Sequence, residues 1–309
     1  MALSNRVSGE KPRVRSRIVA AALLLSGAAA LGGGCLPTQE SASYVTGLRV
    51  LGIKADPPEA APGMTVLLDA LVVDTLGRPI DIVISQCLLV PLQGQSVNLD
   101  CLTGAAGDAL RPLGSGLPLS FTVPLSTDPT MLGRPDSSGG VYLPLVMQLR
   151  AGNDSLTAAY RLRVGAGAAA NHSPILAGVF KVDPQPPDAA AEGGGESETP
   201  LDPALPLIVH AGEELTLRAR FQPGSEELYQ VPDTSGADMP PRSDKEMLRV
   251  SFFSTAGSLS EGSSGVEHPD QILKLDQHLP ESGTLIDLWV VGRDERGGAD
   301  YLRRTLKFQ

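Results

Sequence analysis

The sequence predicts an all-β chain folded as two β-sandwiches in tandem, and three observations lead to this prediction. The chain has 309 residues, enough for about two domains of ordinary size. It is rich in turn formers, with 34 glycines and 26 prolines, and its apolar residues fall in short stretches that alternate with polar ones, as in half-buried strands. A strand-like segment at residues 62–72 is also repeated at 211–221, so two halves of the chain begin alike.

Composition and charge narrow the range of functions. Hydrophobic residues make up 42% of the chain, enough for a packed core and too many for wholesale disorder. The formal net charge is −10, and an acidic surface repels the phosphate backbone of nucleic acids. Aromatic residues are scarce, at 4%, so there is little material for stacking bases. We therefore expect no nucleic-acid partner.

The first 34 residues have the layout of a secretory signal. Four bases lie between Lys11 and Arg17, and an apolar segment follows from Ile18 to Leu31. A positively charged region followed by a short apolar region is typical of a signal peptide. A membrane-spanning helix needs about 20 apolar residues, and this run is shorter. Residues 1–34 are predicted to be a signal peptide.

The segment "LGGGC", residues 31–35, resembles a bacterial lipobox, in which small residues precede a cysteine that becomes the acylated N-terminus. It departs from that pattern at Gly32, where leucine is usual. The resemblance implies lipid on Cys35, a polar tether over residues 35–43, and attachment to a membrane. The alternatives are an ordinary signal cleaved near Ala28–Ala30 and an uncleaved anchor.

The number of cysteines agrees with lipid on Cys35. The chain has three cysteines, and an odd cysteine in an exported protein needs a reason. If Cys35 carries lipid, Cys87 and Cys101 remain as a pair. A disulfide between them would close a loop of about 15 residues and contribute about 3 kcal/mol, and an oxidising compartment favours it. The alternative is that Cys87, which lies in an apolar run, is a buried thiol.

The internal repeat defines the two predicted sandwiches. "PGMTVLLDALV" (62–72) aligns with "AGEELTLRARF" (211–221), and the matched apolar positions alternate, so each copy would present one face to a core. Each half also ends in a strand–turn–strand pattern, at 141–164 and at 284–308. The first domain is therefore predicted at 44–166 and the second at 171–309.

An acidic segment interrupts the second half. Residues 183–206 contain six acidic residues and no basic one, with many prolines and glycines. Such a composition is typical of disorder. We interpret the segment as a disordered loop inside the second domain. The alternative, a linker between the domains, leaves the apolar strand at 174–183 without a partner.

Two further segments carry a family resemblance. "GLRVLGIKADPPEAAPGMTVLLDALVVD" (47–74) resembles the opening of immunoglobulin-like domains in uncharacterised bacterial envelope lipoproteins of the kind abundant in myxobacteria. "MLRVSFFSTAGSLS" (247–260) and "LWVVGRDERGGADYLRRTLKF" (288–308) look like the middle and end of their second domain. The resemblance implies tandem immunoglobulin-like domains behind a lipid anchor, and it brings no catalytic residues.

The sequence carries no motif that predicts catalysis. Gly165-x-Gly167-x-x-Ala170 imitates a dinucleotide fingerprint, but Pro174 ends any helix that would receive the pyrophosphate. No histidines have zinc-site spacing, and no serine-nucleophile motif occurs. Trp289 lies in an apolar strand and is expected to be packed instead of exposed as a ligand platform. We predict no enzyme, no cofactor, no metal and no small-molecule substrate.

The predicted function is a non-catalytic structural or binding role in the cell envelope, with an envelope protein or wall polymer as partner. Leu36, where an aspartate would signal inner-membrane retention, favours the outer membrane. One alternative is an adhesion module stiffened by calcium, for which the candidate ligands lie beside turns: Asp56, Glu59, Asp294, Glu295 and Asp300. Another alternative is a hydrolase with a composite site in the second domain.

Overall fold

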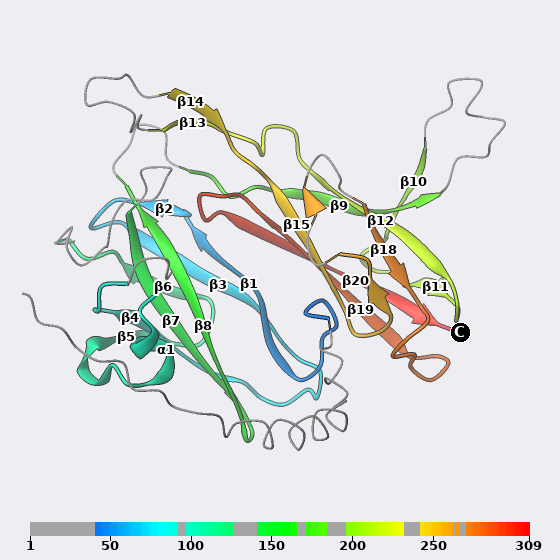
Figure 1. Cartoon of the computed structure of the whole chain (residues 1–309), viewed down its shortest axis with the longest axis horizontal. Helices are drawn as coiled ribbons and strands as arrows, with labels where there is room; N and C mark the ends of the chain where they lie inside the picture. The colour runs from blue at the N-terminus through cyan, green and yellow to red at the C-terminus, as the bar shows by residue number, and fades with distance from the viewer. Residues whose placement is uncertain are drawn as a thin grey trace, which may run out of the picture. The chain divides into compact units, whose positions relative to one another are not determined.

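The computed structural model describes residues 41–91, 97–125, 141–165, 171–183, 196–231, 242–261, 264–265 and 270–309. Residues 41–309 form one compact unit (Figure 1). The predicted signal peptide and Cys35 lie outside the described residues. Within the described ranges, no helix is long and apolar enough to cross a membrane.

The first sandwich consists of two sheets. The smaller sheet has the order β1-β3-β6, formed by Leu48–Asp56, Thr65–Asp74 and Leu119–Thr122. The larger sheet has the order β2-β8-β7-β4-β5, formed by Glu59–Ala60, Asp154–Val164, Val141–Ala151, Asp81–Cys87 and Leu110–Ser115. Two short helices, α1 (Leu99–Thr103) and η1 (Gly107–Ala109), lie between β4 and β5 in the chain.

The second sandwich repeats this plan. One sheet has the order β10-β9-β12-β18-β16, formed by Ser197–Pro200, Leu176–Asp183, Glu214–Phe221, Asp270–Lys274 and Ser258–Leu259. The other has the order β11-β20-β19-β15-β17, formed by Leu207–Val209, Ala299–Phe308, Leu285–Arg293, Arg249–Ser254 and Ser264–Gly265. A separate hairpin, β13–β14 (Leu228–Val231 and Arg242–Lys245), is inserted between β12 and β15.

The sheets β2-β8-β7-β4-β5 and β11-β20-β19-β15-β17 correspond element by element, and β1-β3-β6 corresponds to the β9-β12-β18 part of the remaining sheet. In each sandwich a short strand, β2 or β11, pairs in parallel with the last long strand, β8 or β20. The long hairpins β7–β8 and β19–β20 occupy equivalent places; Figure 1 draws the first in green and the second in orange to red. Two packed sheets with this strand order form an immunoglobulin-like β-sandwich, so the predicted all-β fold class is confirmed.

The repeat seen in the sequence is strand β3 in one sandwich and β12 in the other. Val66 and Leu68 are at most 1% exposed in the first core, and the matching Leu215 and Leu217 are equally buried in the second. Each strand is preceded by a glycine with positive φ, Gly63 at 84° and Gly212 at 78°, a conformation that glycine adopts without strain.

The prediction of disorder across residues 183–206 is wrong for its described part. Residues 197–200 form β10, which pairs antiparallel with β9, and Leu201 is buried against the second core. Two of its acidic side chains, Glu196 and Glu198, form ion pairs with Arg218. Composition alone gave the wrong answer because this arginine lies on β12, distant in sequence. Residues 184–195 lie outside the described part of the chain.

Candidate functional site: the contact between the two sandwiches

The two sandwiches meet through apolar side chains on the outer face of strand β19. Ile286, Leu288 and Val290 point into the core of the second sandwich, whereas Trp289 and Val291 point the other way. These two are 3% and 0% exposed and form a separate cluster with Leu51 and Val45. Four partly buried side chains pack around this cluster: Leu71, Val73, Phe253 and Tyr301. Trp289 is therefore packed, as predicted, but between the sandwiches and not inside one.

A β-bulge in β1 shapes the first sandwich's side of this contact. The β1–β3 register shifts between Val50 and Gly52, which leaves Leu51 outside the ladder. Its side chain enters the cluster with Trp289, and its carbonyl accepts a hydrogen bond of 2.5 Å from Nη2 of Arg293. A Cβ on Gly52 would lie 3.0 Å from Cγ1 of Val291. The glycine therefore allows β1 to approach the second sandwich closely.

The N-terminal end of the described chain also lies on the second sandwich. The Val45 amide donates to the Ser254 carbonyl at 2.8 Å, and the Ser254 amide donates to the Ser43 carbonyl at 2.9 Å. The Tyr44 ring stacks on His278, with ring centroids 3.9 Å apart. Ser43, the last residue of the predicted tether, thus pairs with the end of β15. Residues 35–40 lie outside the described part.

Polar groups flank the apolar cluster where β1 and β3 meet β20. The Tyr301 hydroxyl donates to Oδ2 of Asp69 at 2.7 Å. The Lys54 ammonium lies 4.7 Å from the centre of the Tyr301 ring and 3.9 Å from Oδ1 of Asp300. Burial, followed by the Asp69 carboxylate, raises the pKa of Tyr301, so the hydroxyl stays protonated as a donor at neutral pH.

A buried charge cluster joins the sandwiches at a second place. Arg296, with a side chain only 3% exposed, donates from Nη2 to Glu59 at 2.9 Å and from Nη1 to Glu246 at 3.1 Å. Glu59 belongs to the first sandwich and is also 3.2 Å from Nε of Arg163. Charges this deeply buried are stabilised only by paired partners, so the cluster favours the sandwiches staying in contact.

Glu246 is the member of this cluster whose charge depends on physiological pH. Its side chain is fully buried, and burial, followed by repulsion from Asp294, raises its pKa to about 7, although Arg296 acts in the opposite direction. Removing a carboxylate from water disfavours its ionised form. The neutral and ionised forms of Glu246 therefore both occur near neutral pH.

The turn between β19 and β20 holds Arg296 in place. Oδ1 of Asp294 accepts hydrogen bonds from the amides of Arg296 and Gly298, at 2.8 and 2.7 Å, and its Oδ2 accepts one from Asn171. The Tyr160 hydroxyl of the first sandwich donates to the Gly297 carbonyl at 3.0 Å. The sequence predicted a strand–turn–strand pattern at 284–308, but not that its turn bridges two sandwiches.

Four of the five carboxylates considered for calcium have protein partners. Glu59 faces the two arginines, and Asp294 caps its own turn. Glu295 accepts a hydrogen bond from Tyr229, and Asp300 accepts one from the Leu176 amide. Asp56 lies exposed at the end of β1. Within the described ranges, no three His, Cys, Asp or Glu side chains gather as a group that could hold a metal ion.

Two cavities bear on the chemistry that the chain could perform. One, of about 300 Å³, lies at the contact and is lined by β1, β8 and the β19–β20 turn, including Arg293. The other, of about 260 Å³, lies in the second sandwich beside the end of β12. It includes Ser225, whose hydroxyl bonds the backbone of Ile175, and the described residues that line it include no histidine. That cavity shows no nucleophile–base pair of the kind a hydrolase uses.

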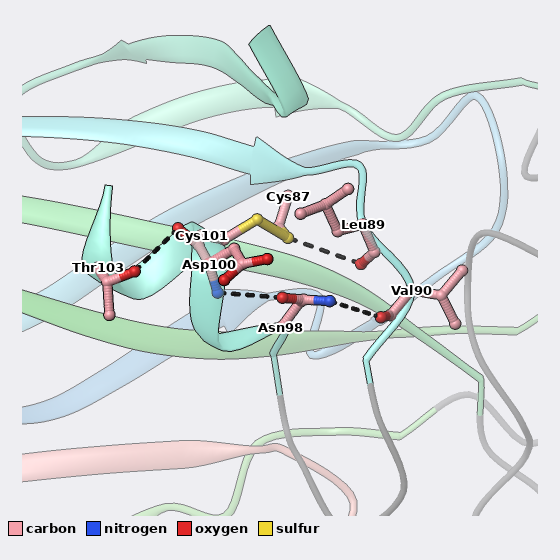
Figure 2. The surroundings of a disulfide bond; sticks show 7 residues. All are labelled: Cys87, Leu89, Val90, Asn98, Asp100, Cys101 and Thr103. Atoms are coloured by element: carbon pink, nitrogen blue, oxygen red, sulfur yellow. Dashed lines mark hydrogen bonds between the residues drawn. A yellow bond between two sulfur atoms is a disulfide. The ribbon is translucent and has the colours of Figure 1, made fainter. Parts of the chain in front are cut away.

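The predicted disulfide between Cys87 and Cys101 is present in the structure. It joins the end of β4 to helix α1, with Cα atoms 6.0 Å apart (Figure 2). Both cysteines are buried with Val97 and Val146. Asn98 begins the helix: its side-chain oxygen accepts a hydrogen bond from the Asp100 amide, and its nitrogen donates to the Val90 carbonyl. The helix is thus fixed over the outer face of β7.

Comparisons with known proteins show no family for this chain. No family model and no curated protein matches it. Among solved structures, it is similar to three N-terminal domains of the highly immunogenic outer capsid protein of bacteriophage RB49, at 10% identity and a TM-score of 0.21, over 85% of this chain and 70% of that one.

Two larger proteins match at a similar level. Salmonella alpha-2-macroglobulin has 10% identity and a TM-score of 0.21, over 85% of this chain and 17% of that one. Dimeric latent PorU from Porphyromonas gingivalis has 8% identity and a TM-score of 0.19, over 85% of this chain and 24% of that one. TM-scores this low contribute nothing to the functional argument.

Proposed function

We propose that this chain is a non-catalytic binding or structural module of the cell envelope, attached to a membrane by lipid on Cys35. The observation that carries the proposal is the buried contact between the sandwiches. Trp289 and Val291 pack against Leu51, and Arg296 reaches Glu59. A chain that buries this much side-chain surface between two sandwiches presents one continuous surface to a partner, as structural and binding modules do.

The described N-terminal residues support a short attachment. Val45 and Ser43 are hydrogen-bonded to Ser254, so the described fold includes the chain from Ser43. A basic and apolar segment and then "LGGGC" precede it in the sequence. The proposed site of attachment is therefore a few residues ahead of the fold, and the proposed compartment is the outer membrane, with an envelope protein or wall polymer as partner.

Metabolic labelling tests the anchor. Cells expressing the full chain are grown with a clickable palmitate analogue, and the wild type is compared with Cys35→Ala. We expect label on the wild type only, and slower electrophoretic migration of the unprocessed variant. Equal labelling of both proteins, or no label on either, contradicts the proposal.

Crosslinking in intact cells tests the binding role. The wild type and Cys35→Ala are crosslinked, and the attached material is identified as protein or wall polymer. We expect one envelope component to be captured by the wild type and much less by the variant, because the anchor confines the chain to that compartment. A hydrolytic activity of the purified full chain would contradict the non-catalytic part of the proposal.

A further inference from the structure

The cavity at the contact has apolar walls and one strongly basic group. Its volume is about 300 Å³, at the lower end for sites that bind small molecules. Apolar residues from both sandwiches line it: Val50, Ile53, Ala158, Ala159 and Ala299, of which the first three also pack against the first core. Arg293, at the end of β19, also lines it. Such a cavity suits a ligand with a short apolar body and a polar end.

Arg293 has few acceptors for its N–H groups. Nη2 donates to the Leu51 carbonyl at 2.5 Å, and Nη1 makes a long contact of 3.4 Å with the Ser251 hydroxyl. Burial lowers the pKa of this guanidinium, and no carboxylate offsets that effect. Within the described part of the chain, Arg293 therefore has no ion pair, unlike Arg296 and Arg218, each of which faces three carboxylates.

Asp294, the carboxylate nearest to Arg293 in sequence, is not its counter-ion. Asp294 lines the same cavity, but its Oδ1 accepts the amides of Arg296 and Gly298, and its Oδ2 accepts the Asn171 side chain. These bonds direct its charge toward its own turn. A partly buried guanidinium without a counter-ion is costly, and its planar fork matches a carboxylate.

We propose that this cavity binds a small carboxylate with a short apolar body. The carboxylate accepts the remaining N–H groups of Arg293, and the apolar part lies against Ile53 and the alanines of β8. The cavity is lined from both sandwiches, so the ligand would stabilise their contact. The inference rests on the binding role proposed above, but it does not depend on the lipid anchor. A free short-chain acid and the C-terminus of an apolar peptide share this chemistry.

The test uses the full chain purified in detergent and four probes. Hexanoate represents the free acid, and N-acetyl-Ala-Leu with a free carboxylate represents the peptide terminus; hexanamide and the peptide amide are their neutral counterparts. Binding is measured by calorimetric titration and by the shift in melting temperature. Three variants are compared with the wild type: Arg293→Gln removes the guanidinium, Ala159→Phe fills the cavity from an exposed position on β8, and Arg249→Gln removes an exposed arginine from the same sheet.

We expect at least one of the acids to bind the wild type and Arg249→Gln with equal affinity, and its neutral counterpart to bind at least ten-fold more weakly. Arg293→Gln and Ala159→Phe should each weaken the acid at least ten-fold. Ala159→Phe keeps Arg293 and its hydrogen bond to Leu51. Weaker binding of the acid by both variants is therefore not explained by a loosened contact between the sandwiches.

Three results would overturn the carboxylate site: no acid binds the wild type at tens of millimolar, acid and amide bind equally, or all variants bind equally. Comparison of the two acids distinguishes the two sources of the carboxylate. Tighter binding of hexanoate indicates a free short-chain acid, and tighter binding of N-acetyl-Ala-Leu indicates a peptide C-terminus. If no acid binds in the titration but crosslinking in cells still captures a partner, the carboxylate site is refuted and the proposed function is not.

Discussion

Strands β7 and β19 occupy the same place in the two sandwiches, and both are buried on both faces by different means. In the first sandwich, Val146 of β7 is covered by helix α1, which the Cys87–Cys101 disulfide fixes in place. In the second, Trp289 and Val291 of β19 are covered by β1 of the other sandwich. The shared topology leaves the outer face of the equivalent strand apolar in both sandwiches. Helix α1 covers this face in the first sandwich, and strand β1 of the first sandwich covers it in the second.

The two covers differ in their chemistry. The helix is held by a covalent bond within one loop, so its stability should depend on redox conditions. The contact between sandwiches is held by apolar packing and by buried charges, among them Glu246 with a pKa of about 7. Its stability should depend on pH. Substitutions confined to one cover or the other separate these two dependences.

The largest effect is expected from Trp289→Ala. Removing a buried aromatic side chain from a packed site costs about 3–5 kcal/mol, and here the loss falls on the contact. Val146→Ala is the matched variant beneath the helix and should cost less, because fewer atoms are removed. Urea denaturation measures both, and hydrogen exchange at Val45 and Gly52 reports on the contact. Equal exchange in the two variants would mean that the tryptophan does not hold the sandwiches together.

The second effect is the loss of the disulfide. The double variant Cys87→Ser, Cys101→Ser removes a cross-link that closes a loop of about 15 residues, and it should reduce stability by about 3 kcal/mol. The loss should be confined to the first sandwich, with faster hydrogen exchange in β4 and α1 and unchanged exchange in β19. Protection lost equally in β19 would show that the two covers are not independent.

The third effect is a pH dependence of the contact. Folding raises the pKa of Glu246 from 4.5 to about 7, so the folded state binds a proton more tightly than the unfolded state does. The resulting stabilisation is fully present below the unfolded pKa and is lost as pH rises through the folded one. Between pH 5 and pH 8 the free energy of unfolding should fall by about 2 kcal/mol, because each ten-fold difference in proton affinity corresponds to about 1.4 kcal/mol.

Glu246→Gln is the variant that checks this dependence. It keeps the shape and an acceptor for Arg296, so the slope between pH 5 and pH 8 should flatten. Burial also raises the pKa of Asp294, which adds a contribution of the same sign. Arg296 and Glu59 face the same cluster. A slope unchanged by Glu246→Gln would assign the pH dependence to another group.

The fold of each sandwich could be predicted from the sequence because local patterns of apolar and polar residues indicate its strands. The alternation in 62–72 and 211–221 predicted the repeat, and the number of cysteines favoured a disulfide between Cys87 and Cys101 over a buried thiol. The repeated pattern lies within single strands, and the two cysteines close one loop. These signals do not depend on which surfaces meet in the folded chain, so they were sufficient to predict the strands and the disulfide.

The contact could not be predicted because its partners lie far apart in sequence. Arg296 pairs with Glu59, 237 positions away. No pattern in the sequence around either residue indicates that it belongs to a contact. A Cβ on Gly165 would lie 2.0 Å from a Glu59 oxygen, so the missing side chain of this glycine makes room for that carboxylate, a role that its place in the sequence does not indicate. Val50–Gly52 looked like ordinary strand because nothing local distinguishes a bulge from continuous pairing.

The smallest predicted effect concerns the start of helix α1, and it tests whether the first cover needs more than its disulfide. Asn98→Ala removes the acceptor for the Asp100 amide and the donor to Val90. Loss of such a cap costs about 1 kcal/mol. Since Cys101 still ties the helix to β4, the loss should appear as faster hydrogen exchange over residues 98–103 with little change in the global melting temperature. In the background without the disulfide, the same substitution should cost more, because the cap is then the remaining local restraint on the helix. Equal costs in the two backgrounds would mean that cap and disulfide act independently, and that the packing of Val97 over Val146 alone keeps β7 covered.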